Sequence, residues 1–284
     1  MIKKVKIIEC PRDAMQGIKE FIPTEKKILY INQLLKIGFD TIDFGSFVSP
    51  DIIPQLKDTA EVLDGLDLST SSSKLLAIIA NLKGAEIACN FEAISYLGFP
   101  LSVSEKFQQI NTNKSITEAL DLVEEIQNLS IKNNKQLVVY LSMAFGNSYK
   151  ESWHPHIVAE LTEKLSNLGI FIIALSDTIG VSSHKNIIPL FKTLIKEYPS
   201  IEFGAHFHTN PDEWEEKIDA SYKSGCKRFD TTIKGYGGCP MSQDELVGNM
   251  PTERVLSFFE SKEIDLNLDN IVLNTVGNNM SVYF

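Results

Sequence analysis

The chain of 284 residues is 43% hydrophobic and 23% charged, which excludes a disordered protein and allows a substantial core. Its formal net charge of −10 argues against nucleic acid as a partner, because phosphate backbones bind to concentrated basic surfaces. No apolar stretch approaches membrane-spanning length, so we expect a cytoplasmic protein that does not contact membranes.

Apolar runs typical of β-strands alternate with helical patterns from one end of the chain to the other. Residues 1–9 are expected to contain the first strand and not a signal peptide, because their apolar run is short and Glu9 follows it. A capping box formed by Ser115 and Glu118 marks the start of one helix. The expected strands are residues 5–8, 41–44, 75–80, 89–97, 136–141, 170–174, 201–206 and 228–232. The expected helices are residues 26–36, one opening near Ser49 and Pro50, 82–88, 115–128, 155–168, 186–197 and 212–224.

This order gives eight strand-then-helix units with short connections, which predicts a parallel sheet. Eight units in a chain of this length fit a closed (β/α)8 TIM barrel of the α/β class. An open doubly wound sheet is the alternative, but no glycine-rich phosphate turn follows the first strand. We expect one domain over residues 1–284, with extra C-terminal helices after the eighth strand that form a cap over about 241–284.

His206 and His208 lie at the end of the seventh predicted strand, and residues two apart on a strand point to the same face. Two imidazoles on one side of a strand end are half of a metal site or a pair of acid/base groups. The same spacing also occurs by chance in structural or solvated pairs. The polar residues at the other strand ends therefore decide between a functional pair and a structural or solvated one.

Active sites of TIM barrels lie at the carboxyl ends of the strands, so polar residues there are candidates. Each alone could be a helix cap or a loop group bound to backbone, but they recur at strand after strand. Asp13, His206, His208 and Asn249 together offer nitrogen and oxygen ligands without a thiolate, which suits Mg²⁺ or Mn²⁺ and argues against a structural zinc site. The candidates at the strand ends are Arg12, Asp13, Asp43, Asn81, Ser142, Asp177, His206, His208, Thr231 and Thr232.

A glycine-rich loop after the eighth strand carries Cys239 between Gly238 and Pro240. The glycines allow unusual backbone angles, and the proline stiffens the exit of the loop. A thiol on such a loop can enter a closed site as a proton donor or a nucleophile, although the glycines could serve only a turn. The remaining cysteines lack zinc-ligand spacing and are expected to pack as small hydrophobic residues: Cys10, Cys89 and Cys226.

Seven short motifs run in order over nearly the whole chain: PRDAMQ at 11–16, SFVSP at 46–50, NLKG at 81–84, SDTIG at 176–180, AHFH at 205–208, GGCP at 237–240 and GNMPTE at 248–253. Together they resemble the hydroxymethylglutaryl-CoA lyases, within a wider group of metal-dependent barrel lyases and synthases. The glycine–cysteine loop favours the lyases within that group. The resemblance implies a retro-Claisen cleavage of 3-hydroxy-3-methylglutaryl-CoA to acetyl-CoA and acetoacetate.

The resemblance also implies a cofactor and a ligand set for it. Asp13, His206, His208 and Asn249 match the ligands of a divalent metal, Mg²⁺ or Mn²⁺, which Zn²⁺ could replace in crystals. The expected small-molecule partner is an acyl-CoA, and we expect a homodimer because two-fold symmetry is the commonest assembly.

Catalytic roles follow from the same resemblance. Arg12 matches the residue that stabilises the enolate oxygen, Cys239 matches the catalytic thiol, and either Asp13 or His206 is the base for the hydroxyl. The side chains expected to contact substrate are Arg12, Gln16, Asp43, Asn81, Ser142, Asp177 and Glu253.

Departures from the family pattern leave the acyl specificity open. Cys10 precedes Pro11 where a glycine is usual, and Ala14 and Met15 replace the usual glycine and leucine. A related synthase or aldolase acting on 2-oxo acids is one alternative, and an acyl-CoA-binding barrel without turnover is another.

Overall fold

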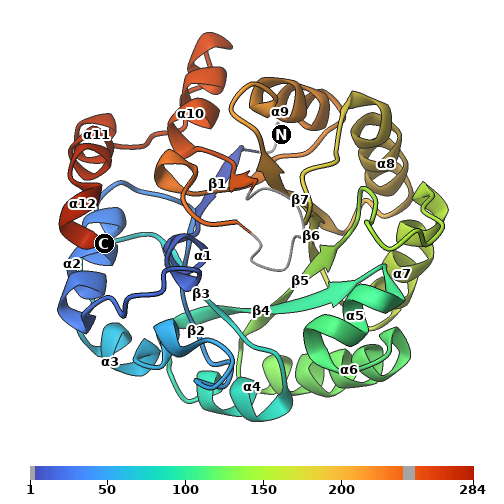
Figure 1. Ribbon diagram of the computed structural model, residues 1–284, viewed down its shortest axis with the longest axis horizontal. Coiled ribbons are helices and arrows are strands. Elements are labelled where there is room, and N and C mark those ends of the chain that lie inside the picture. The colour runs from blue at the N-terminus through green and yellow to red at the C-terminus, as the bar shows by residue number, and fades with distance from the viewer. Residues whose placement is uncertain (1–3, 239–246) are drawn as a thin grey trace.

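The computed structural model describes residues 4–238 and 247–284. Eight parallel strands, β1 to β8, pair in chain order around a ring that closes where β8 pairs with β1 (Figure 1). The TIM-barrel prediction is therefore confirmed. The barrel strands are β1 (Lys6–Glu9), β2 (Thr41–Ser46), β3 (Lys74–Ile78), β4 (Ile94–Ser102), β5 (Gln136–Ser142), β6 (Ile172–Asp177), β7 (Glu202–Thr209) and β8 (Arg228–Thr231).

A layer of helices covers the outside of the barrel (Figure 1). Because side chains fill the inside and helices cover the outside, every residue of β2 and of β6 is buried. The predicted capping box of Ser115 and Glu118 is present at the start of the longest barrel helix. The helices after successive strands are α2 (Thr24–Leu35), α3 (Thr59–Asp64), α4 (Leu82–Cys89), α6 (Ile116–Lys132), α7 (Pro155–Asn167), α8 (His184–Glu197), α9 (Trp214–Lys223) and α10 (Thr252–Ser261).

Two predicted boundaries are wrong. The fourth strand begins at Ile94 and not near Cys89, because α4 continues to Cys89. After β2, no regular helix opens at Pro50; a 3-10 turn, η1 (Pro54–Leu56), comes first and α3 follows it. Four short elements were not predicted: α1 (Pro11–Gln16), α5 (Glu105–Thr112), a second 3-10 turn η2 (Ile233–Gly235) and strand β9 (Gly248–Asn249).

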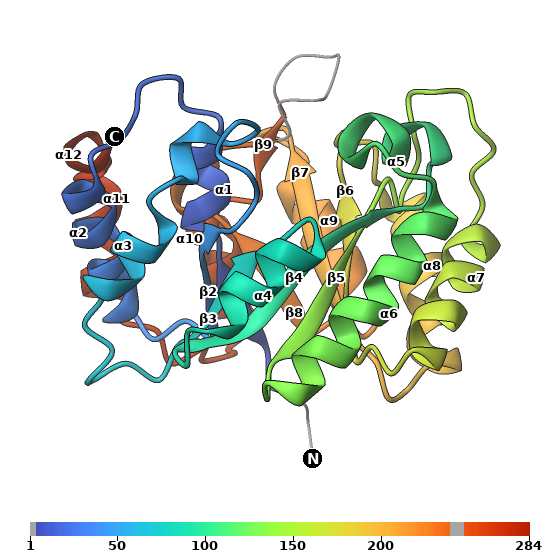
Figure 2. The ribbon, with the colours of Figure 1, turned by 90° about the horizontal axis from the view of Figure 1, so that it is seen from below.

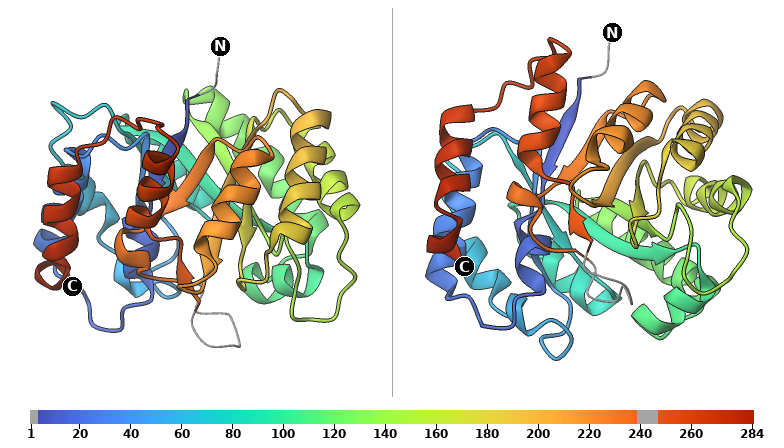
Figure 3. Two further views of the ribbon diagram at one scale, coloured as in Figure 1. Left: turned by 90° about the horizontal axis from the view of Figure 1, so that it is seen from above. Right: turned by 45° about the horizontal axis from the view of Figure 1, so that its top comes forward.

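The C-terminal helices α11 (Asn270–Asn278) and α12 (Met280–Tyr283) lie beside α2 on the outside of the barrel (Figure 3). The ring of Tyr30 in α2 packs on Tyr283 at 4.9 Å and on Phe284 at 5.5 Å between centroids. These helices extend the outer layer and do not cover the mouth of the barrel. Within residues 4–238 and 247–284, none of the helices has both the length and the apolar character needed to cross a membrane.

The main core lies between the strands and the surrounding helices, and a second apolar cluster fills the barrel interior. Tyr140 belongs to the interior cluster and also lines the cavity that opens above it, so this cluster forms the floor of that cavity. The interior cluster consists of Leu76, Tyr96, Val138, Tyr140, Ile172 and Ala174.

Candidate active site

One cavity of about 750 Å³ opens at the carboxyl ends of the strands, which lie at the top of Figure 2. Its polar wall includes seven of the predicted residues: Arg12, Asp13, Gln16, Asn81, Ser142, His206 and His208. Its apolar wall comes from the segment after β2 and from α5: Val48, Ile52, Ile53, Phe107 and Ile110. The cavity can therefore hold a ligand that has both a charged and an apolar part.

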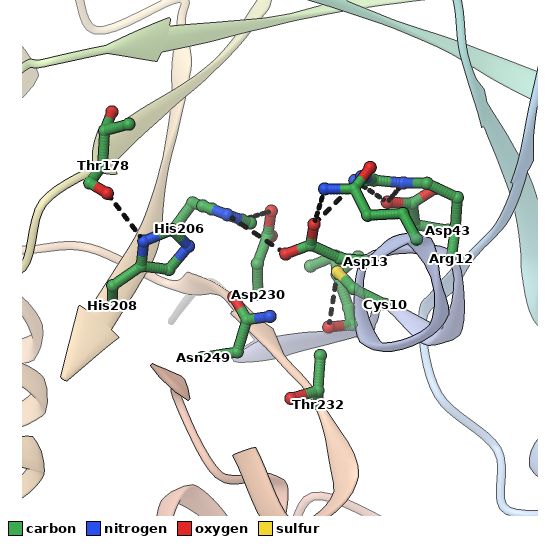
Figure 4. A network of polar contacts seen from close by, with 12 residues as sticks. Cys10, Arg12, Asp13, Asp43, Thr178, His206, His208, Asp230, Thr232 and Asn249 are labelled. Carbon is green, nitrogen blue, oxygen red and sulfur yellow. Dashed lines mark hydrogen bonds and ion pairs between the residues drawn. The ribbon is translucent and has the colours of Figure 1, made fainter. Parts of the chain in front are cut away.

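Asp13, His206 and His208 converge in this cavity (Figure 4). One ligand atom from each residue lies within 4.8 Å of the others. Asp13 is carried by α1, which Pro11 starts at its first position, and both histidines are carried by β7. Strand β9 runs antiparallel to the end of β7 and pairs Asn249 with His208. All four predicted metal ligands thus come to one place.

Both imidazoles are held through the nitrogen that faces away from Asp13. His206 Nδ1 lies 3.1 Å from Asp230 Oδ2, and His208 Nδ1 lies 2.9 Å from Thr178 O. Since a carbonyl or carboxylate oxygen accepts, Nδ1 carries the proton in each ring and Nε2 keeps its lone pair. His206 Nε2 lies 3.9 Å from Asp13 Oδ2. This arrangement is the one in which outer partners orient metal-binding histidines.

The two carboxylate oxygens of Asp13 have different surroundings. Oδ1 accepts hydrogen bonds from Arg12 Nη1 at 3.0 Å and from Gln16 Nε2 at 2.8 Å. Oδ2 is buried and has no hydrogen-bond partner among the described residues. Burial alone would raise the pKa of Asp13, but the interactions of its carboxylate with Arg12, His206 and His208 hold this pKa below its usual value. An ionised, unpartnered oxygen facing two imidazole lone pairs fits a divalent cation.

Arg12 is fixed by three neighbours that leave part of its guanidinium available. Nε and Nη2 donate to Asp43 Oδ2 at 2.9 and 2.6 Å, and Nη1 donates to Asp13 and to Gln16. These contacts use four of the five guanidinium N–H groups, so one Nη2 hydrogen can face the cavity that Arg12 lines. Burial raises the pKa of Asp43 to about 6, although Arg12 opposes this. The guanidinium stays charged because Asp43 and Asp13 raise its pKa against the effect of burial.

The pKa values of the two imidazoles differ in direction. Burial lowers the pKa of His206, but the hydrogen bond and charge of Asp230 together with the charge of Asp13 raise it overall. Burial and the neighbouring His206 lower the pKa of His208. The pKa of His206 is therefore shifted above, and the pKa of His208 below, the value of a free imidazole.

The glycine loop after β8 packs directly on α1. Gly237 has φ +89°, and a Cβ there would lie 2.5 Å from the backbone oxygen of Asp13 and 2.8 Å from Asn249 Nδ2. Only glycine allows this approach, which brings the loop against two of the predicted ligands. Asn249 Nδ2 donates to Tyr236 O at 3.0 Å, so Oδ1 is the atom that this amide can offer to a cation. Cys239 lies outside the described residues.

Comparison with known families agrees with this geometry. The model of the HMGL-like family matches residues 4–279, which is nearly the whole chain. The chain belongs to the HMGL-like family.

Curated relatives of this HMGL-like protein span almost its full length. It is 32% identical over 267 residues to the hydroxymethylglutaryl-CoA lyase of Bacillus subtilis, covering 94% of this chain and 88% of the relative. It is 31% identical to the 3-hydroxy-3-isohexenylglutaryl-CoA/hydroxymethylglutaryl-CoA lyase of Pseudomonas aeruginosa, covering 97% of this chain and 91% of the relative.

Two solved structures share the fold of the HMGL-like protein closely. The B. subtilis HMG-CoA lyase superposes with a TM-score of 0.92 at 31% identity, over 99% of this chain and 93% of the other. An Acinetobacter baumannii HMG-CoA lyase in complex with coenzyme A and 3-methylmalate has a TM-score of 0.91 at 29% identity, over 99% and 91% of the two chains.

Three of the predicted substrate contacts do not line the cavity that the structure describes: Asp43, Asp177 and Glu253. Asp43 is fully buried beneath Arg12. Asp177 points to the outside of β6, where its carboxylate accepts hydrogen bonds from Lys217 and from backbone N–H groups. Glu253 accepts a hydrogen bond from Lys234 N at the start of α10. These groups support the site from behind and do not line it.

The other predicted positions are divided between cavity and packing roles. Asn81 lines the cavity and also caps α4, with Oδ1 accepting from Gly84 N at 2.8 Å. Ser142 lines the cavity at the end of β5. The two strand-end threonines bond to neighbouring segments instead: Thr231 contacts Glu9, and Thr232 donates to Tyr236 O.

Asp230 and Lys217 were not found from the sequence as parts of the site. Asp230 could have been suspected, because Arg228 and Asp230 place two charges on one face of a strand that is otherwise buried. Lys217 has no comparable signal, since one lysine on an amphipathic helix is ordinarily solvated. Only the fold shows that its side chain is 1% exposed.

Proposed function

We propose that this protein is a hydroxymethylglutaryl-CoA lyase, which cleaves 3-hydroxy-3-methylglutaryl-CoA to acetyl-CoA and acetoacetate. The observation that carries the proposal is the unpartnered Oδ2 of Asp13, which faces His206 and His208 beside the guanidinium of Arg12. Relatives with that activity cover nearly the whole chain, and one solved relative holds coenzyme A. An acyl-CoA is accordingly the proposed substrate.

We further propose that Asp13, His206, His208 and Asn249 hold Mg²⁺ or Mn²⁺. The donor set of one carboxylate, two imidazoles and an amide oxygen fits such ions. When bound, the ion would supply a positive charge that acidifies and orients the hydroxyl of the substrate.

The residues of the chain then have separate tasks in the cleavage. Asp13 or His206 accepts the proton of the 3-hydroxyl group, and the oxygen lone pair forms the new ketone of acetoacetate. The C2–C3 bond breaks, and its electron pair passes into the thioester as an enolate. The spare Nη2 hydrogen of Arg12 can bind the enolate oxygen, because Asp43 and Asp13 already fix the guanidinium. A proton delivered to C2 completes acetyl-CoA, and Cys239 is the proposed donor.

The shape of the cavity suits the two ends of this substrate. The carboxylate and the hydroxyl would lie near Arg12 and the histidines, where the wall is polar. The methyl group and the pantetheine arm would lie along the apolar wall of Val48, Phe107 and Ile110.

The test is a product assay on the purified protein with Mg²⁺ or Mn²⁺ and 3-hydroxy-3-methylglutaryl-CoA. We expect acetoacetate and acetyl-CoA in equal amounts, with activity lost on EDTA treatment and restored by the metal. The His206→Ala variant should lose orders of magnitude in turnover, while His156→Ala, which removes an exposed histidine, should not. Metal-independent turnover, or full activity in His206→Ala, would contradict the proposal. Release of free thiol from acetyl-CoA and a 2-oxo acid would instead identify a synthase.

A further inference from the structure

Lys217 in α9 is a buried ammonium that the proposed reaction does not use. Its Nζ donates to Asp177 Oδ2 at 3.0 Å, to Gly180 O at 3.1 Å and to His208 O at 2.8 Å. An ammonium has three N–H groups, so these contacts account for all of them. Lys217 therefore joins the helix to two other places: the end of β7 and the turn that follows β6.

The turn after β6, residues 177–180, is itself tightly held. Asp177 accepts hydrogen bonds from Val181 N at 2.8 Å and from Ser182 N at 3.0 Å, in addition to Lys217. Gly180 has φ +72°, and a Cβ there would lie 2.8 Å from Val247 Cγ1. The conformation of the turn thus depends on the buried carboxylate of Asp177 and on a glycine.

This turn holds His208 at two points. The carbonyl of Thr178 accepts the Nδ1 proton of the His208 ring, and Lys217 links the carbonyl of His208 to Gly180 and Asp177. The main chain and the side chain of one residue are therefore tied to the same four-residue turn. A shift of the turn relative to β7 would break the bond that keeps His208 Nε2 toward Asp13.

We propose that Lys217 is a positioning residue for His208. It does not line the cavity, so it acts through the turn and through the backbone of β7. The inference rests on the proposed function, because His208 matters as a metal ligand. Loss of the ammonium would release the turn from β7, allow the His208 ring to change tautomer and orientation, and weaken metal binding.

The main variant is Lys217→Met, which keeps the length of the side chain and removes its charge and donors. The matched control is Lys223→Met on the same helix, whose side chain is 67% exposed and pairs with Asp219. We expect Lys217→Met to raise the dissociation constant for Mn²⁺ about 10- to 100-fold, measured by titration of the metal-free protein. We expect ¹⁵N NMR of the metal-free protein to show His208 as a mixture of tautomers, where the wild type has its proton on Nδ1. The control should change neither readout.

Lys217→Met leaves the Asp177 carboxylate without its cation, which could prevent folding. The double variant Lys217→Met with Asp177→Asn removes the uncompensated negative charge. Its Mn²⁺ affinity and its His208 tautomer are measured in the same way. A wild-type Mn²⁺ affinity together with a wild-type His208 tautomer in a folded variant would overturn the role of Lys217, even if the melting temperature fell. If the wild type itself binds no Mn²⁺, the proposed function fails, whereas the tautomer comparison still decides whether Lys217 orients His208.

Discussion

His206 Nδ1 and Asp230 Oδ2 lie 3.1 Å apart, and the register of the barrel places the two residues directly beside each other on β7 and β8. The carboxylate therefore fixes which imidazole nitrogen faces Asp13. Its charge also raises the pKa of His206 against the effect of burial. The candidate metal site thus depends on a residue that does not reach the cavity wall.

Replacing Asp230 with asparagine should weaken metal binding. An amide is a poorer acceptor for the Nδ1 proton, so the His206 ring loses its fixed tautomer. We expect the dissociation constant for Mn²⁺ to rise about 10- to 100-fold, measured by calorimetry on the metal-free protein. Asp121→Asn, at an exposed position of α6, is the control and should bind Mn²⁺ like the wild type. Equal affinities in the two variants would show that Asp230 does not orient His206.

Replacing Arg12 with lysine should reduce kcat more than it changes KM. Lysine keeps the charge but cannot donate to Asp43 and to the enolate oxygen in the same planar arrangement. The loss of one fixed donor to a developing oxyanion predicts a decrease in kcat of about 100- to 1,000-fold. Steady-state kinetics should be compared with Arg254→Lys, an exposed position on α10. A rise in KM alone would mean that Arg12 only binds substrate.

Replacing Gly237 with alanine should reduce metal binding and turnover more than it reduces the stability of the fold. A Cβ there would lie 2.5 Å from Asp13 O and 3.0 Å from Ala14 Cα, so backbone atoms of α1 must move. The positive φ adds a cost of about 1–2 kcal/mol. We expect weaker Mn²⁺ binding and lower turnover with a modest decrease in melting temperature. Gly17→Ala is the matched control, since a Cβ at Gly17 meets no atom within 4 Å. Identical behaviour of the two variants would refute the requirement for glycine at this contact.

The buried acid Glu9 should make stability depend on pH. Burial raises the pKa of Glu9 from 4.5 to about 8, although hydrogen bonds from Thr252, Ile233 and Thr231 oppose this. Between these pH values the folded state keeps a proton that the unfolded state has lost. The free energy of unfolding should therefore fall as pH rises through this window, by up to about 1.4 kcal/mol per pH unit from this group.

Glu9→Gln removes this titration and keeps the shape of the side chain. Urea unfolding at several pH values measures the free energy of unfolding of both proteins. The value for the variant should rise relative to that of the wild type as pH rises from about 5 to about 8. Glu86→Gln, at an exposed position of α4, is the control, and its free energy of unfolding should depend on pH as that of the wild type does. Parallel pH curves for Glu9→Gln and the wild type would mean that Glu9 ionises normally in the folded protein.

Much of the fold could be predicted because its signals are local. Apolar runs that alternate with amphipathic helices gave the order of eight strands, and the capping box at Ser115 gave a helix start that the structure confirms. The missed elements have weaker signals: α1 is six residues long and begins at Pro11, and β9 has two residues and exists only because it pairs with the end of β7. Such elements depend on partners distant in sequence.

The His-x-His spacing by itself determined that two imidazoles project to one side of a strand, because side chains alternate along an extended backbone. The polar residues at the strand ends likewise located the site at one end of the barrel. The tertiary structure decided which of these residues reach the cavity, because alternation does not say which face of a strand points inward. The tertiary structure also turned Asp177 outward, and it brought Asp230 to His206 and Lys217 to His208. These contacts depend on the register between strands and on the path of a buried side chain, and both are set by packing across the whole barrel.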